Sequence, residues 1–241
     1  KNKDKNTIDD FIKTNSISKP KQPKPRITFV QPNILKNPLV KLEKVCYKIE
    51  NSVIIKDLDL VINNDSKICI FGKNGVGKST LLKLITKKLN QTSGKIEHND
   101  ILKIGYFEQN FESELDLKLT PILYLNNTEI HGTHKMLSYF GLEKTYFNVP
   151  ISNLSGGQIA KTKFASLFMN KPHLLVLDEP TNHLDLPSID LLVNAINTYL
   201  GSIILVTHNL YLLEKLNLDM YHFENSFLTK IKNLDELIFD S

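Results

Sequence analysis

The sequence predicts an α/β fold built on a mainly parallel sheet, and three observations support this prediction. Aliphatic strands alternate with helical segments in the second half of the chain, as in parallel sheets whose strands are joined by helices. A glycine-rich turn at residues 72–79 lies between a predicted strand and a predicted helix. Residues 174–177 are all aliphatic and two acids follow them, which is typical of a buried strand whose carboxyl end carries a ligand site.

The composition limits the class of protein. The chain has 241 residues, of which 41% are hydrophobic and 23% are charged, as in ordinary soluble globular proteins. Its aliphatic runs are too short to cross a bilayer, and its first residues lack the basic-then-apolar pattern of a secretion signal. The two cysteines, Cys46 and Cys69, lie in predicted strands among apolar residues. We therefore expect a cytoplasmic protein with reduced core cysteines and no membrane partner.

The net charge of +4 is unevenly distributed along the chain. Residues 1–26 hold seven lysines and Arg26 against three aspartates, a net charge of +5, whereas the remaining residues hold 22 basic and 23 acidic side chains. A body so close to neutral does not indicate a nucleic-acid groove, and we expect no specific DNA partner. Residues 1–37 are predicted to be a basic interdomain linker with one short helix near residues 9–13, and residues 38–241 are predicted to be the folded domain.

The predicted elements follow one another in a simple order. Strands are expected at residues 39–47, 53–55, 58–62 and 67–71, a helix follows the glycine-rich turn, and two further strands follow that helix at residues 94–97 and 102–107. Residues 115–150 carry apolar side chains at the spacing of short helices, which indicates a small helical subdomain. The last elements are a helix at 158–169, a strand at 174–177, a helix at 188–200 and a strand at 203–207.

The turn at residues 72–79 reads Gly-Lys-Asn-Gly-Val-Gly-Lys-Ser, which fits the phosphate-loop pattern G-x-x-x-x-G-K-[ST] at every fixed position. Its glycines allow a tight turn whose amides point at phosphate oxygens, and the following helix adds its positive dipole end. Lys78 is expected to reach the β- and γ-phosphates, and Ser79 to complete a Mg²⁺ shell. A chance glycine turn does not explain a full match in this context. The candidate nucleotide-binding residues are Gly72, Asn74, Gly75, Gly77, Lys78, Ser79 and Thr80.

Asp178 and Glu179 follow the aliphatic strand at residues 174–177. Asp178 is suited to hold Mg²⁺ through water, and Glu179 is suited to act as the general base on an attacking water. An aliphatic strand that ends in acids is common as a purely structural feature. Downstream of a complete phosphate loop, the two acids are better explained as catalytic groups.

Residues 154–158 read Leu-Ser-Gly-Gly-Gln and resemble the signature of the ATP-binding cassette (ABC) superfamily. A serine hydroxyl and two glycine amides that open a helix form an anion-binding nest, although a serine there also suits a plain helix cap. In the cassette family the signature of one domain closes on the nucleotide held by the phosphate loop of another. The resemblance therefore implies that Ser155, Gly156 and Gly157 contact the nucleotide of a second, head-to-tail cassette.

The same resemblance extends from Leu39 to about Lys232 and assigns further roles. Gln109 matches the glutamine that senses Mg²⁺ and the attacking water, His208 matches the switch histidine that contacts the γ-phosphate, and residues 184–185 match the loop that crosses the dimer interface. The resemblance thus implies ATP and Mg²⁺ as cofactors, Glu179, His208 and Gln109 as catalytic residues, and Ser79, Gln109 and Asp178 as metal-binding residues. We assign no metal-ligand role to the other histidines, which are His98, His131, His134, His173, His183 and His222.

The cassette resemblance also implies a fold and a branch. The implied fold is that of a P-loop NTPase of the ABC type, with a mainly parallel sheet, an antiparallel β subdomain and a helical subdomain at about residues 111–165. Residues 181–185, Thr-Asn-His-Leu-Asp, are similar to the F branch, whose members are soluble, carry two cassettes in one polypeptide and act mostly on ribosomes and translation. Residues 26–40 resemble the segment that precedes the second cassette in that branch. We therefore expect the C-terminal cassette of such a protein.

This cassette is expected to be an ATPase that is slow in isolation, paired with a second cassette and acting with the ribosome or a translation factor. The alternatives are the nucleotide-binding subunit of an ABC transporter and a non-catalytic binding module, although Glu179 and His208 argue against the latter.

Three positions depart from the family pattern. Lysines stand where an arginine usually follows the signature, at Lys161 and Lys163, and Asn209 replaces the usual aspartate after the switch histidine. The aromatic residue that stacks on adenine would fall at Ile49 in the usual register, and the nearest aromatic residue is Tyr47. Tyr47 is therefore the candidate for adenine contact.

Overall fold

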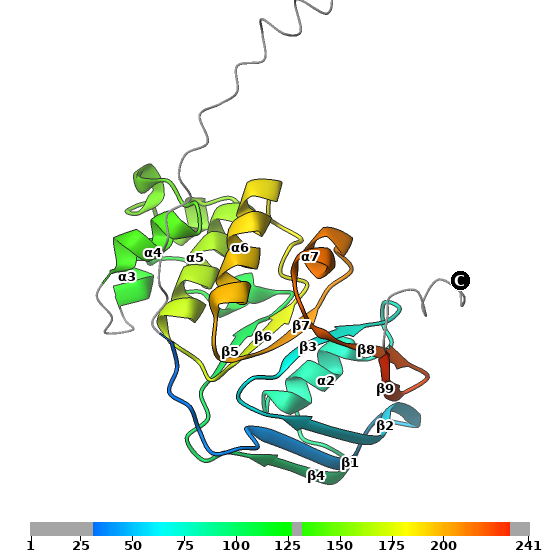
Figure 1. Ribbon diagram of the computed structural model, residues 1–241. Coiled ribbons are helices and arrows are strands. Elements are labelled where there is room, and N and C mark those ends of the chain that lie inside the picture. The colour runs from blue at the N-terminus through cyan, green and yellow to red at the C-terminus, as the bar shows by residue number, and fades with distance from the viewer. Residues whose placement is uncertain (1–30, 127–131, 232–241) are drawn as a thin grey trace, which may run out of the picture.

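The computed structural model describes residues 31–126 and 132–231. A six-stranded sheet lies at the centre of the domain (Figure 1). The strand order is β5-β6-β7-β3-β8-β9. The first five of these strands are parallel and β9 is antiparallel to β8, which confirms the predicted mainly parallel sheet. The strands are β3 (Lys67–Phe71), β5 (Ile104–Phe107), β6 (Leu174–Asp178), β7 (Ser202–Val206), β8 (Asp219–Glu224) and β9 (Phe227–Ile231).

Both faces of the central strands are covered, which explains the aliphatic runs at residues 174–177 of β6 and 203–206 of β7. Every residue of β6 and β7 is buried. Leu175 and Leu177 pack on the side of α5 (Gly156–Met169) and α6 (Leu186–Thr198), while Leu174 and Val176 pack on the side of α2 (Lys78–Ile85). Helix α7 (Leu210–Lys215) covers β3 on the face of α5 and α6 through Leu213.

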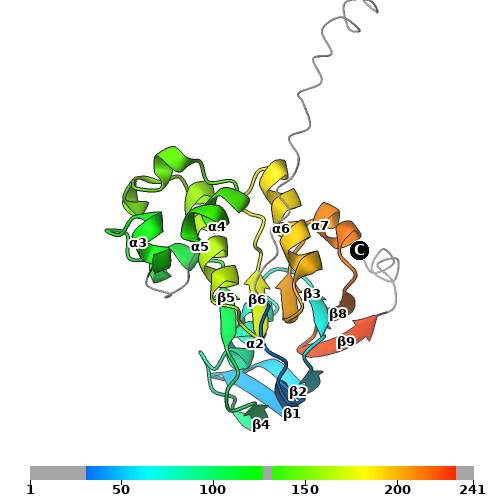
Figure 2. The same cartoon turned by 60° about the vertical axis from the view of Figure 1, so that its left-hand side comes forward.

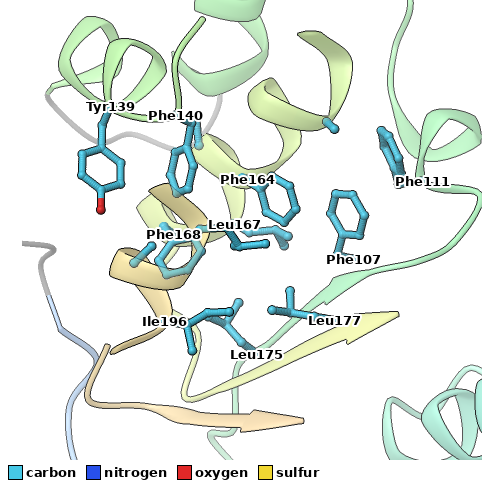
Figure 3. Close-up of a cluster of buried hydrophobic side chains, with 14 of the residues drawn as sticks. Phe107, Phe111, Tyr139, Phe140, Phe164, Leu167, Phe168, Leu175, Leu177 and Ile196 are labelled. Carbon is cyan, nitrogen blue, oxygen red and sulfur yellow. The ribbon is translucent and has the colours of Figure 1, made fainter. Parts of the chain in front are cut away.

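Aromatic side chains join the helical subdomain to the sheet (Figure 3). The rings of Phe107 and Phe164 stack with their centroids 4.4 Å apart, and Phe140 lies 5.3 Å from Phe168. The subdomain contains α3 (Pro121–Asn126), α4 (Thr133–Tyr139) and 3-10 turns at Phe111–Glu114, Lys144–Tyr146 and Ile151–Asn153. Helices α3 and α4 lie beside α5 (Figure 2), and α5 continues unbroken through the predicted boundary at residue 165.

A second, antiparallel sheet covers the outer side of α2, with the order β2-β1-β4 (Figure 1). Its strands are β1 (Val40–Ile49), β2 (Ser52–Ile62) and β4 (Ser93–His98). This sheet confirms the predicted antiparallel subdomain, but the prediction of separate strands at 53–55 and 58–62 was wrong. The two segments form one strand, β2. The polar residues between them mark an irregular stretch of that strand, where Asp57 has a φ of 44° and the pairing with β1 shifts register at Val45 and again at Tyr47.

Residues 31–37 lie against the body of the domain. The Gln31 side chain donates to the Thr198 carbonyl at 3.0 Å and accepts from the Leu200 amide at 2.8 Å. Asn64 holds the backbone of Leu35 in the same way, through one donated and one accepted hydrogen bond. The helix expected near residues 9–13 and the linker up to residue 30 lie outside the described residues.

Two further observations bear on the expectations from composition. Both cysteines are free; Cys69 is buried as expected, whereas Cys46 is only half-buried on the bulged strand β1. Within residues 31–126 and 132–231, none of the helices combines the length and the apolar character that crossing a membrane requires.

Candidate functional site

The sheet order brings three separate loops to one place. Strands β6, β7 and β3 are neighbours, and because they are parallel, the segments that follow them emerge at the same edge of the sheet. A pocket of about 550 Å³ opens there. It is lined by Asn74, Gly75, Gly77, Lys78, Ser79, Thr80, Gln109, Asp178, Glu179, Asn182, Val206 and His208.

The phosphate loop is shaped by its last glycine. Gly77 has a φ of 116°, and a β-carbon at this position would lie 2.6 Å from Cγ2 of Ile54. A larger residue is therefore excluded both by its backbone conformation and by contact with β2. No side chain caps α2 at Gly77. The first turn of α2 thus presents its amides at the pocket without a competing partner from a side chain.

Lys78 is held inside this loop. Its Nζ atom donates to the Gly72 carbonyl at 2.6 Å and to the Lys73 carbonyl at 2.9 Å. Burial lowers the pKa of Lys78, while the negative charges of Glu179 and Asp178 oppose that shift. The ammonium group therefore bridges the two ends of the loop, at a position from which it can exchange carbonyl oxygens for phosphate oxygens.

Asp178 lies at the floor of the pocket and is 2% exposed. Burial raises the pKa of its carboxyl group, and a hydrogen bond with Ser79 and the charge of Lys78 oppose that rise. Gln109 lines the same pocket. This set of oxygen donors fits Mg²⁺, which typically keeps several waters and takes one or two protein groups beside substrate phosphates. The described residues contain no group of three or more acidic, cysteine or histidine side chains that could hold a metal ion.

Glu179 and His208 face each other across the pocket. The His208 Nε2 atom lies 3.4 Å from Glu179 Oε1, and the His208 amide donates to Glu179 Oε2 at the same distance. The Glu179 backbone has a φ of 48°, and its amide donates to the Val206 carbonyl at 2.9 Å. This backbone conformation turns the Glu179 side chain away from the line of β6. Burial raises the pKa of Glu179, and His208 opposes the rise. A carboxylate with a raised pKa is a stronger proton acceptor at neutral pH.

The signature residues lie outside this pocket. Ser155 caps α5: its Oγ accepts from the Gln158 amide at 3.4 Å, and its own amide donates to Oε1 of Gln158 at 2.9 Å. The serine thus caps the helix, which was the alternative interpretation of this residue from the sequence. Its hydroxyl hydrogen stays available to another acceptor. A β-carbon on Gly157 would lie 2.8 Å from the His183 carbonyl oxygen, so the signature packs directly on the loop that leads to Asp185.

The structure does not bring Tyr47 to the pocket. Its side chain packs, half-buried, against the cluster on the α2 side of the sheet, while Ile49 is half-exposed. Two residues that the sequence did not single out, Asn182 and Val206, line the pocket. Asn182 had a signal, since it stands inside the Thr-Asn-His-Leu-Asp stretch. Val206 had none, because it is the last aliphatic residue of an ordinary buried strand.

The departures from the family pattern have structural explanations. Asn209 caps α7 by accepting from the Leu212 amide at 3.0 Å, a role that asparagine and aspartate fill equally well. Lys163 is nearly buried and its Nζ atom lies 2.9 Å from Glu114 Oε2.

The fold and the phosphate loop define a P-loop nucleotide-binding domain. A solved structure described as the dimeric post-hydrolysis state of an ATP-binding cassette bound to ADP and phosphate has the same fold. It aligns with a TM-score of 0.68 and 23% identity, covering 81% of this chain and all of that one. The family model described as ABC transporter matches residues 55–182.

Two of the most similar curated relatives carry F-family names. ABC transporter F family member 4 of Dictyostelium discoideum is 40% identical over 78% of this chain and 17% of its own length. ATP-binding cassette sub-family F member 2 of Bos taurus is 36% identical over 80% of this chain and 32% of its own. Protein GCN20 of Saccharomyces cerevisiae is 33% identical over 86% and 28% respectively. This chain belongs to the ATP-binding cassette family, in its F branch, and spans less than a third of the length of these relatives.

Proposed function

We propose that this chain is the ATP-binding and ATP-hydrolysing cassette of an F-branch protein, that it forms one half of a head-to-tail cassette pair, and that the pair acts in the cytoplasm on the ribosome or a translation factor. The observation that carries the proposal is the convergence of Lys78, Asp178, Glu179 and His208 on one pocket. The cassette resemblance and the F-branch relatives support the pairing and the partner.

Binding begins with the phosphates. The amides of the phosphate loop and the start of α2 donate to the phosphate oxygens, and Lys78 leaves the carbonyls of residues 72 and 73 to contact the β- and γ-phosphates. Ser79, Asp178 and Gln109 would hold Mg²⁺, which supplies neutralising charge to the phosphates when bound. Tyr47 and the half-exposed Ile49 are not among the residues that line this pocket, so either of them would contact adenine beyond it.

Hydrolysis needs an oriented water. The water oxygen forms a bond to the γ-phosphorus, the bond from that phosphorus to the β–γ bridging oxygen breaks, and ADP leaves with the electron pair. Glu179 takes the proton of the attacking water, helped by its raised pKa. Gln109 and His208, which both line the pocket, position the water and the γ-phosphate.

The second half of the site comes from another cassette. The Ser155 hydroxyl and the amides of Gly156 and Gly157 would donate to the γ-phosphate held by the partner. Since one chain contributes half of each of two sites, the isolated chain is expected to be mainly monomeric and slow. Pairing would require ATP, and loss of the γ-phosphate would release it.

The proposal is tested by trapping the pair. Glu179→Gln removes the proton acceptor but leaves Lys78, Ser79 and Asp178 in place, so ATP binding is retained while turnover falls by about 10²- to 10⁴-fold, the usual contribution of a general base. Size-exclusion chromatography with light scattering should then show a dimer only with Mg-ATP. Glu97→Gln, an exposed acid on β4 paired with Lys95, is the matched control and should behave like the parent.

Two outcomes would contradict the proposal. A Glu179→Gln variant that hydrolyses ATP at the parent rate would remove Glu179 from the mechanism, and a stable dimer without nucleotide would remove ATP from the assembly step. The partner is tested on the full-length protein carrying the same substitution. Its accumulation on ribosomes in sucrose gradients supports the translation role, whereas accumulation with membranes would favour the transporter alternative.

A further inference from the structure

Four charged side chains form a cluster at the outer edge of β5, which we call the edge cluster: Lys88, Glu108, Glu114 and Lys163. The Lys88 Nζ atom lies 3.0 Å from Glu108 Oε1 and also contacts Glu114. Lys163 Nζ lies 2.9 Å from the other oxygen of Glu114. The two positive and two negative charges balance, and the Lys88 ammonium also lies 5.0 Å from the centroid of the Tyr106 ring.

The edge cluster is partly removed from water. The side chains of Lys163, Glu108 and Glu114 are only 10%, 17% and 27% exposed. Burial alone would raise the pKa of Glu114, but hydrogen bonds from Lys88 and Lys163 outweigh it and hold that pKa below its usual value. A balanced network of this kind holds its members more firmly than an isolated surface pair, and removal of one member leaves another charge uncompensated.

The members of the edge cluster come from three functional parts of the domain. Lys88 follows α2, the helix that begins at the phosphate loop. Glu108 stands directly before Gln109, and Glu114 closes the 3-10 turn behind it. Lys163 lies on α5, the helix that begins at the signature. The ion pairs therefore run from the segment after the phosphate-loop helix to the signature helix, and they involve one acid before Gln109 and one after it in the sequence.

Gln109 itself depends on its neighbours for position. It lies in a turn between β5 and the 3-10 turn, it lines the nucleotide pocket, and within the described part of the chain its side chain makes no hydrogen bond. Phe111 anchors one side of this turn in the aromatic cluster, 4.5 Å from Phe107. On the other side, the Glu108 carbonyl accepts from the Phe111 amide at 3.2 Å, and the Glu108 side chain is paired with Lys88.

We propose that the edge cluster positions Gln109 in the pocket and couples it to the orientation of the signature helix α5. Lys88, Glu108, Glu114 and Lys163 are positioning residues that act through Gln109, so this inference rests on the proposed ATPase function. When α5 shifts, Lys163 moves with it and displaces its ion-pair partner Glu114. Because Lys88 is paired with both Glu114 and Glu108, the same shift also moves Glu108 and the adjoining Gln109.

The test is Lys88→Met, which removes the shared cation. In single-turnover assays of the chain with saturating Mg-ATP, the rate should fall by about 2- to 30-fold, the range found for residues in coupling networks, while the Kd for ATP stays near that of the parent. Without nucleotide, hydrogen exchange of the amides at residues 108–114 should become faster. Lys88→Arg should restore both the rate and the slow exchange.

The matched control is Lys95→Met, which removes a lysine paired with Glu97 on β4 and should change neither measurement. Unchanged exchange at residues 108–114 in Lys88→Met would overturn the proposal, because Phe111 would then suffice to hold the turn. Equal effects of Lys88→Met and Lys95→Met would overturn it as well. A parent chain that does not bind ATP would defeat the proposed function, yet the exchange measurement would still decide whether the edge cluster holds the Gln109 turn.

Discussion

The phosphate loop and the signature are both glycine-containing turns that open a helix, and their caps differ. At the start of α2 the capping residue is Gly77, with a left-handed backbone and no side-chain cap. At the start of α5, Ser155 and Gln158 form a reciprocal capping box. The first helix therefore leaves its amides for a ligand, whereas the second is already stabilised within the chain.

The surroundings of the two turns differ in the same direction. The α2 turn meets the cation of Lys78 and the acids Asp178 and Glu179 in one pocket. The α5 turn lies instead against His183 and Glu112, and Ser155, Gly156 and Gly157 are not among the described residues that line that pocket. The first turn is thus equipped to hold a nucleotide within this chain. Under the proposed function, the second turn would meet a nucleotide that another cassette holds.

The largest effect is expected at the phosphate loop. Lys78→Ala removes a charge-assisted contact to the phosphates, and such contacts are worth about 1.5–3 kcal/mol, so the Kd for Mg-ATP in calorimetry should rise by about 10- to 100-fold. The fold should persist, as judged by circular dichroism. Lys73→Ala is the matched control, since only the carbonyl of Lys73 takes part in the loop. Equal ATP affinity in the parent and Lys78→Ala would erase the distinction between the two turns.

A smaller effect is expected at the signature. Ser155→Ala removes the cap of α5 and should lower the free energy of unfolding by about 0.5–2 kcal/mol, while ATP binding to the monomer stays unchanged. ATP-dependent pairing in the Glu179→Gln background should be lost. Ser155→Asp sharpens the contrast, because aspartate restores the cap but places a negative charge against the phosphates of the partner. It should therefore recover stability and not pairing; pairing by Ser155→Asp would show that the serine is only a cap.

The smallest effect concerns the pH dependence of stability. Burial raises the pKa of Asp178 in the folded chain, so its contribution to stability is fully present below the unfolded value near 3.8 and is lost as the pH rises through the folded pKa. Without nucleotide, Asp178→Asn should thus be more stable than the parent at pH 7, and the gain should vanish as the pH falls towards 4. Urea unfolding across this range measures it.

Asp185→Asn should change the stability at pH 7 in the opposite direction. A hydrogen bond with Ser188 lowers the pKa of Asp185, so its contribution is present above the unfolded value and is lost on acidification. The substitution should reduce stability at pH 7, and the difference should fade at low pH. If both variants shifted stability in the same direction, the pH dependence would not arise from these two carboxyl groups.

Most of the phosphate-loop part of the site could be predicted from the sequence, and the reason is physical. A strand, a tight turn and a helix are local structures, so residues 67–85 carry all the information needed to place Lys78 and Ser79. The strand at residues 174–177 was equally clear, because a strand buried on both faces must be aliphatic. Parallel neighbours then bring Asp178 and Glu179 to the same edge of the sheet.

What the sequence left open lies where the structure depends on distant partners. Register shifts in β1 displace the alternation of its side chains, so counting along the strand could not decide between Tyr47 and Ile49. The pairs of Lys88 with Glu108 and of Lys163 with Glu114 join residues 20 and 49 positions apart, which no local pattern reveals. The capping role of Ser155 was visible from the sequence, yet the sequence could not say that Gly157 would meet His183.

Gly157 would have to remain glycine even in a cassette that had lost hydrolysis. A β-carbon there would stand 2.8 Å from the His183 carbonyl oxygen of the same chain, so any substitution displaces the loop that leads to Asp185. An intact signature glycine therefore marks a correctly folded domain rather than an active one. If Glu179 and His208 act as proposed, inactive cassettes are better identified at these two positions, whose side chains meet each other in the pocket.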